Sequence, residues 1–112
     1  MNILLTIRYK ELWYSLPLER RTEIVTATVA FHDRHLKAGK LKDTYTFGDG
    51  KLMSVWDVAS FEEMLSILLE HPYSGFVDFD PAPFLDHKTV VKLIAERRGV
   101  AAVAAARAAK KK

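Results

Sequence analysis

The segment Pro72-Tyr-Ser-Gly-Phe-Val-Asp-Phe-Asp-Pro-Ala-Pro-Phe-Leu-Asp-His87 decides the fold more than any other part of the chain. Apolar and acidic residues alternate within it, which predicts a terminal strand over residues 73–80 with two carboxylates on one face. Pro81 and Pro83 cannot donate to a backbone ladder, so this strand must end there or run along a sheet edge. Such a strand borders a helix-covered core on one face and a polar cavity or a subunit contact on the other.

Upstream of this segment, the sequence predicts one strand, one helix and a hairpin. Alternation over residues 3–7 indicates a strand with two distinct faces. A helical period over residues 19–38 ends at Gly39, a common residue at a helix C-terminus. Residues 41–47 and 51–58 are predicted strands, because the Asp-Gly pair between them is a strong hairpin signal.

A second helix is predicted between the hairpin and the terminal strand. Ser60 and Glu63 have the spacing of a capping box, and Pro72 ends the helix that follows. The order β-α-β-β-α-β predicts an α+β, ferredoxin-like subunit over residues 1–87. Residues 88–112 are predicted to form a helical, alanine-rich C-terminal extension.

Composition limits the class of protein. A chain of 112 residues forms one domain, and its mean hydropathy of −0.04 is typical of a soluble protein. It contains no cysteine, no apolar run near the roughly 20 residues of a membrane span, and no secretory signal after Met1. We therefore expect a cytoplasmic protein without membrane contact.

The net charge of +3 does not indicate nucleic-acid binding. Lys110, Lys111 and Lys112 account for all of it, so residues 1–109 are formally neutral. A nucleic-acid interface needs basic residues clustered on the folded body. No nucleic-acid partner is expected.

The strand order and several local sequences resemble the muconolactone isomerase family, small bacterial enzymes of aromatic-acid breakdown. The match is strongest over residues 72–87, in register at Pro72, Asp78, Pro83 and His87, and it extends to Gly48, Ser54, Asp57 and Val58. The resemblance implies that two subunits pair sheet to sheet into a dimeric α+β barrel, from which larger rings are built. It also implies an acidic residue midway along the first helix, where this chain has Thr28. Threonine is not a general base at neutral pH without an activating partner.

His32 and His35 are the candidate catalytic residues. They lie three positions apart on the first predicted helix, so they are neighbours on its surface, where they could transfer a proton. A half-buried, hydrogen-bonded histidine is the alternative interpretation of His35. No metal site is expected, because Asp33, the third ligand that the sequence offers, points roughly 100° away from His32.

Four further residues are candidate substrate-binding groups. The first and last strands are predicted antiparallel neighbours, and matching parity pairs Arg8 with Asp78 on the face away from the helices. Arg8 would hold an anionic group of the substrate, or the pair would be an ion pair at a dimer contact. Tyr45 and Trp56 would shape an apolar pocket, or simply pack within the protein.

Together these features predict a muconolactone-isomerase-like, cofactor-free enzyme that isomerises a small hydrophobic or lactone-like acid by proton transfer, in aromatic compound catabolism. The alternatives are a non-catalytic oligomerising or ligand-binding module and a cofactor-independent oxygenase of the same barrel type. A homodimer or larger homo-oligomer is expected. The face predicted to form it is too apolar to remain in water, and it bears Leu4, Thr6, Trp56 and Phe76.

Overall fold

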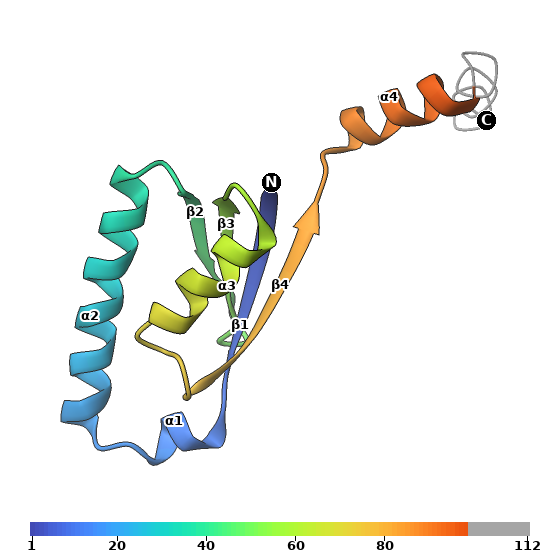
Figure 1. Cartoon of the computed structure of the whole chain (residues 1–112). Coiled ribbons are helices and arrows are strands. Elements are labelled where there is room, and N and C mark those ends of the chain that lie inside the picture. The colour runs from blue at the N-terminus through green and yellow to red at the C-terminus, as the bar shows by residue number, and fades with distance from the viewer. Residues whose placement is uncertain (99–112) are drawn as a thin grey trace.

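The structure, a computed structural model, describes residues 1–98 of the chain. Its elements are β1 (Asn2–Tyr9), α1 (Glu11–Ser15), α2 (Leu18–Lys37), β2 (Leu41–Thr46), β3 (Leu52–Asp57), α3 (Phe61–Glu70), β4 (Val77–Phe84) and α4 (His87–Arg98) (Figure 1). The predicted α+β, ferredoxin-like order is confirmed, with the short helix α1 added in a segment that the sequence left as a loop.

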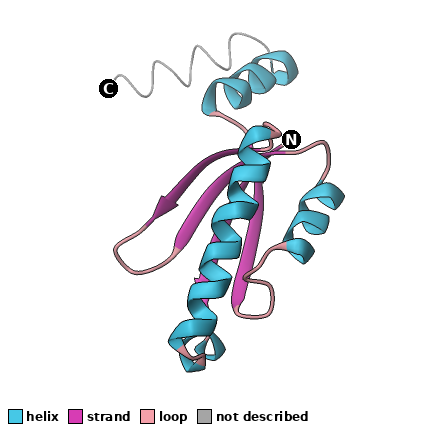
Figure 2. Ribbon diagram, turned by 90° about the vertical axis from the view of Figure 1, so that its left-hand side faces the viewer, coloured by secondary structure: helices cyan, strands magenta, loops and turns pink. Residues whose placement is uncertain are grey.

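The four strands form one antiparallel sheet in the order β2-β3-β1-β4. Helices α2 and α3 lie over the same face of this sheet (Figure 2). Alternate side chains of β1 therefore meet different surroundings, and Ile3, Leu5 and Ile7 are buried under the helices. Leu4 and Thr6 are half-buried on the opposite face, where no helix of residues 1–98 lies over the sheet.

The terminal strand lies further along the chain than predicted. Residues 72–76 form a turn in which Gly75 has a φ of 92°, and β4 then runs from Val77 past both prolines. Pro81 lies opposite Leu5 in the ladder. The prolines are tolerated because β4 is an edge strand, which was one of the two arrangements that the sequence allowed.

Two aromatic residues do not lie on the open face where they were predicted. Trp56 pairs with Ile3 across the ladder, so its side chain points under the helices and is fully buried. Phe76 belongs to the turn before β4 and packs against the core. The prediction that these two aromatics lie on the open face is therefore wrong, and the cause is the register of β3 and the start of β4.

Local sequence explains where the two core helices begin and end. Ser60 caps α3 by accepting a hydrogen bond from the backbone N–H of Glu63 at 3.1 Å, as the capping-box spacing predicts. Pro17 precedes the first turn of α2, and Gly39 follows its end with a φ of 74°, a left-handed conformation that glycine adopts without strain. The buried side of α2 carries Ile24, Thr28 and Phe31.

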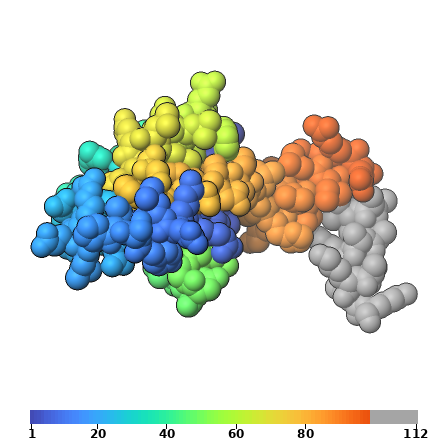
Figure 3. Space-filling model, turned by 90° about the horizontal axis from the view of Figure 1, so that it is seen from below, coloured from blue at the N-terminus to red at the C-terminus, as the bar shows by residue number. Residues whose placement is uncertain are grey.

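Helix α4 stands apart from the rest of the structure. It follows β4 beyond the end of the sheet and projects from the body of the molecule (Figure 3). None of its residues is buried. The remaining part of the predicted extension, residues 99–112, lies outside the described residues. Within residues 1–98, no helix combines the length and the hydropathy needed to cross a membrane.

Candidate active site

A cavity of about 400 Å³ lies between α2 and the sheet. This volume is within the range of small-molecule sites. Its lining mixes apolar side chains with one imidazole, several hydroxyl groups and three phenols. The lining residues are Ile7, Tyr9, Val25, Thr28, Val29, His32, Thr44, Tyr45, Thr46, Leu52, Met53, Ser54 and Tyr73.

His32 is the nitrogen base on the cavity lining. Its side chain is half-buried on α2, next to the fully buried ring of Phe31. Burial lowers the pKa of His32 below its ordinary value, and the nearby His35 lowers it further, while Asp33 opposes the change. The imidazole is therefore mainly neutral at pH 7 and can accept a proton.

His35, the other predicted catalytic residue, has different surroundings. Its ring packs against Phe31 at 4.5 Å and against Trp56 at 5.3 Å between centroids. It does not line the cavity, and its buried Nε2 atom has no hydrogen-bond partner within residues 1–98. Burial lowers the pKa of His35, with smaller contributions from Arg34 and Lys40.

A third histidine, His71, lies next to these two and was missed from the sequence. It is 3% exposed, and its ring lies 4.7 Å from Phe31 and 6.0 Å from His32 between centroids. Its Nδ1 atom accepts the backbone N–H of Tyr73 at 3.0 Å, so the proton of the neutral ring is on Nε2, which has no partner in the described residues. Burial, followed by His32 and His35, lowers the pKa of His71 to about 3.

The helical pattern of the sequence indicated that His71 is buried. His71 lies three residues after Leu68 and four after Ile67, both of which are buried on the inner face of α3. Extending that face by one residue beyond the helix places His71 in the core.

Two hydrogen-bonded tyrosines close another side of the cavity. The hydroxyl of Tyr9 donates to that of Tyr73 at 3.2 Å, and the ring of Trp13 stacks on Tyr9 at 5.0 Å. Burial and the bond to Tyr73 raise the pKa of Tyr9 well above its ordinary value. Tyr9 therefore stays protonated over the physiological range and donates its one hydroxyl proton to Tyr73, so the Tyr73 hydroxyl is the one in this pair that can donate to a ligand.

Thr28 and Trp56 each satisfy a hydrogen bond at the cavity wall. The hydroxyl of Thr28 donates to the backbone carbonyl of Ile24 at 2.8 Å. Trp56 does not line the cavity, but its indole N–H donates to Ser54, a lining residue, at 2.8 Å. Tyr45, predicted together with Trp56, does line the cavity.

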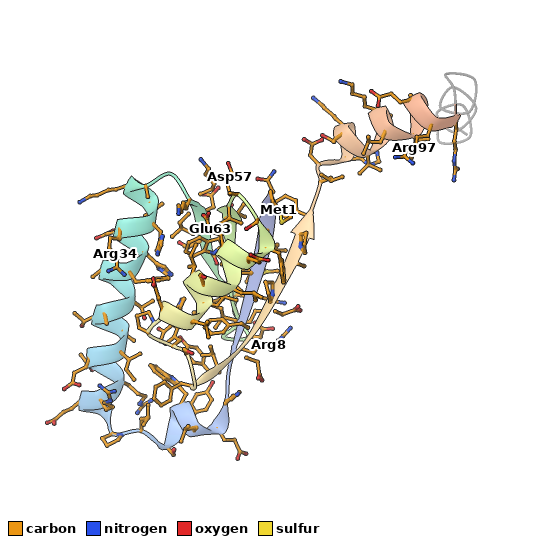
Figure 4. All side chains as sticks on the ribbon, viewed as in Figure 1. Met1, Arg8, Arg34, Asp57, Glu63 and Arg97 are labelled. Atoms are coloured by element: carbon orange, nitrogen blue, oxygen red, sulfur yellow. The ribbon has the colours of Figure 1, made fainter. Side chains whose placement is uncertain are left out.

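The structure separates Arg8 and Asp78 from the histidines. The two residues are direct partners in the β1–β4 ladder, as strand parity predicted. Arg8 extends from β1 far from Arg34 on α2 (Figure 4), and it lines a second cavity of about 240 Å³ with Tyr14 and Lys51. The carboxylate of Asp78 pairs with Lys10 at 3.6 Å in an exposed contact. Within residues 1–98, no group of three or more acidic, histidine or cysteine side chains has the geometry of a metal site.

The burial of His71 makes the stability of the protein dependent on pH. The pKa of this residue is about 3 in the folded state and near 6.5 in an unfolded chain, so the unfolded state binds more protons between these values. We expect His71 to reduce the free energy of unfolding by up to about 1.4 kcal/mol per pH unit as the pH falls below about 6.5. Urea unfolding at pH 7 and pH 5 measures this slope.

His71→Asn is the matched variant for this experiment. The asparagine oxygen can still accept the Tyr73 N–H, but the side chain does not titrate. Between pH 7 and pH 5, the free energy of unfolding of the variant should fall less steeply than that of the wild type. The difference in slope corresponds to about one proton fewer taken up on unfolding. If the free energy of unfolding depended on pH equally in the wild type and the variant, His71 would be accessible to protons in the folded state.

Comparison with known proteins supports the fold. No protein-family model and no curated protein matches the sequence. Among solved structures, the chain is similar to 5-chloro-2-hydroxyhydroquinone dehydrochlorinase from Burkholderia phenoliruptrix AC1100, solved in complex with 2,5-dihydroxybenzoquinone. The two share a TM-score of 0.61 and 17% identity, over 80% of this chain and 98% of that chain. At this identity the likeness establishes a shared α+β, ferredoxin-like fold.

Proposed function

We propose that the chain is a cofactor-free enzyme that transfers a proton on a small, hydrophobic, ring-containing acid bound between α2 and the sheet. The observation that carries the proposal is His32, a half-buried neutral imidazole on the lining of a 400 Å³ cavity. An imidazole whose pKa is lowered by burial is unprotonated at physiological pH and can remove an activated proton.

The surroundings of His32 fit an unsaturated ring. Apolar residues and tyrosines dominate the lining, and Tyr9 keeps its proton because its pKa is raised. Because Tyr9 donates this proton to Tyr73, the Tyr73 hydroxyl is the group that can donate to a carbonyl oxygen as negative charge develops on it. The fold is shared with a dehydrochlorinase whose structure contains 2,5-dihydroxybenzoquinone, which supports a ring compound of this size as the ligand.

Thr28 argues against muconolactone as the substrate. It occupies the position where the resembling family has an acidic residue, and its hydroxyl is already donated to Ile24. We therefore expect slow or absent turnover of muconolactone. The proposed role of Arg8 in binding an anionic group requires a substrate that extends past Tyr9, since Tyr9 lines both cavities and Arg8 lines only the second.

Narrowing the cavity should weaken ligand binding. Val29 lies on α2 at the cavity lining and is 57% exposed, so Val29→Phe adds bulk there without disturbing the core. Leu36→Phe is the control, because Leu36 is exposed on the same helix and does not line the cavity. With 2,5-dihydroxybenzoquinone as the probe and calorimetry as the measurement, we expect Val29→Phe to weaken binding about tenfold or more, a cost of about 1.4 kcal/mol. Equal affinity in both variants would place the ligand elsewhere.

Removing His32 should abolish most of the proton transfer. The assay is exchange of a carbon-bound proton for deuterium on 2,5-dihydroxybenzoquinone, followed by NMR, with muconolactone as a comparison compound expected to exchange slowly. We expect His32→Ala to lower the rate about a hundredfold, the usual contribution of a general base. The wild-type rate should fall as the pH drops through the lowered pKa of His32, because protonation removes the base.

His87→Ala is the histidine control for this assay, because His87 is exposed at the start of α4. Exchange that is unaffected by His32→Ala would contradict the assignment of the base. Binding of the quinone without any exchange would instead favour the ligand-binding module.

The face of the sheet that no helix covers within residues 1–98 supports a homodimer as the oligomeric form of the protein. Leu4 and Val55 are direct partners in the ladder, and Thr6 follows Leu4 on the same side of β1. These side chains lie on the face that has no covering helix within residues 1–98. Packing two such faces together buries them, as the family resemblance implies.

A charge in this face should prevent association. We expect Leu4→Glu to form smaller species than the wild type at the same concentration in sedimentation equilibrium, because it places a carboxylate among apolar side chains. Leu18→Glu, at an exposed position on α2, is the control and should leave the dimer intact. A wild type that is monomeric at micromolar concentration would refute the dimer.

A further inference from the structure

Helix α4 lacks the contacts that stabilise a helix of its length. It has 12 residues, none of which is buried, and it projects beyond the sheet (Figures 1 and 3). Isolated helices of this length are marginal in water, and most helical stability in proteins comes from packing an amphipathic face. The fold therefore predicts that α4 packs against a surface that the single chain does not provide to it.

The surface of α4 is both apolar and basic. Val90, Leu93 and Ile94 share one side of the helix at helical spacing and are 37–42% exposed. Arg97 continues the same side, one turn after Leu93, and lies in the last turn of α4, the end far from the sheet (Figure 4). A binding partner for α4 should therefore offer exposed apolar side chains next to carboxylates.

The outer side of α3 has this complementary character. Leu65 and Leu69 lie one turn apart on it and are 45% and 81% exposed, which is unusual for leucines on a short amphipathic helix. Glu62, which is exposed, lies on the same side of the helix three residues before Leu65, and Glu70, also exposed, follows Leu69 at the C-terminal end of α3. Neither of these carboxylates has an ion-pair partner within residues 1–98.

The distribution of charge along the chain agrees with this pairing. Residues 1–86 contain nine Lys and Arg against thirteen Asp and Glu, a net charge of −4. Residues 87–112 contain eight basic residues and one acidic residue, a net charge of +7. The overall charge of +3 hides this division, which favours contact between the C-terminal part of one chain and the body of another.

We propose that α4 of one copy docks on the outer side of α3 of a second copy, with the apolar rows in contact and the arginines of α4 facing Glu62 and Glu70. Within one chain, α4 lies away from α3 (Figure 1), so a second copy supplies the missing surface. A reciprocal exchange buries both leucine pairs in a symmetric dimer. The proposal does not depend on the reaction at His32.

Amide hydrogen exchange of residues 87–98 tests the docking directly. We expect these amides to be protected at high protein concentration and to lose protection on dilution below the dissociation constant. Salt should also reduce the protection, since screening weakens the charge pairing. Protection that does not change on dilution would mean that α4 folds back on its own chain, and would overturn the proposal. Protection of these amides that appears only when duplex DNA or RNA is added would also overturn the proposal.

Side-chain variants identify the surfaces. Ile94→Ser and Leu69→Ser should each weaken association by about tenfold in sedimentation equilibrium, the usual scale for exposing a buried aliphatic side chain. Glu96→Ser on α4 and Leu18→Ser on α2 are the matched controls and should leave association unchanged. A persistent dimer with unprotected α4 amides would refute this contact and leave the sheet-face dimer standing.

Charge reversal in trans identifies the partner as a second copy. One chain carries Arg97→Glu with Arg98→Glu, and the other carries Glu62→Lys with Glu70→Lys. Each chain alone should associate weakly, because every α4–α3 contact then joins like charges. Their mixture should recover association, since both contacts of the mixed dimer join opposite charges. Failure of the mixture to exceed either chain alone would exclude α3 as the docking surface.

Discussion

The ring of Phe31 is the contact on which the rest of the site depends. It is 1% exposed and packs against His35 and His71 with centroids less than 5 Å away, and against Trp56 of β3 at 6.1 Å. This packing fixes the rotation of α2 about its axis. Because His32 follows Phe31 directly, the same rotation directs its imidazole to the cavity. One aromatic contact thus holds α2 on the sheet and sets the position of the candidate base.

Burial has opposite effects on the two kinds of titratable group at this site. It lowers the pKa of His32 and His71 and raises the pKa of Tyr9, since the neutral form of each group is favoured away from water. A neutral imidazole that can accept a proton and a neutral phenol that donates a hydrogen bond to Tyr73 therefore exist together at pH 7. The cost is the unpartnered Nε2 of His71, a buried donor without an acceptor in the described residues.

Local patterns in the sequence predicted the order of elements, the capping of α3 and the ladder register that places Arg8 opposite Asp78, although the carboxylate of Asp78 pairs with Lys10. Each of these depends on neighbours in sequence or on the alternation of strand side chains. The side to which Trp56 points was not predictable in this way. Valine and tryptophan alternate with similar hydrophobicity in β3, so the ladder register with β1 decides which of them is buried.

The site was predicted less well, because it is assembled from residues distant in sequence. The burial of His71 depends on Phe31 and Phe79, which lie on other elements, and neither contact has a local signature. The cavity lining joins α2 to the edge of β2 and to Tyr9 at the end of β1. The sequence identified His32 from its spacing to His35, but only tertiary packing distinguishes the imidazole that reaches the cavity from the one that packs on Trp56.

The alternation of side chains along β1 separates the cavity from the face of the proposed dimer. Ile7 and Tyr9 line the cavity, while Leu4 and Thr6 lie on the opposite face, where substitutions test the proposed dimer without entering the cavity.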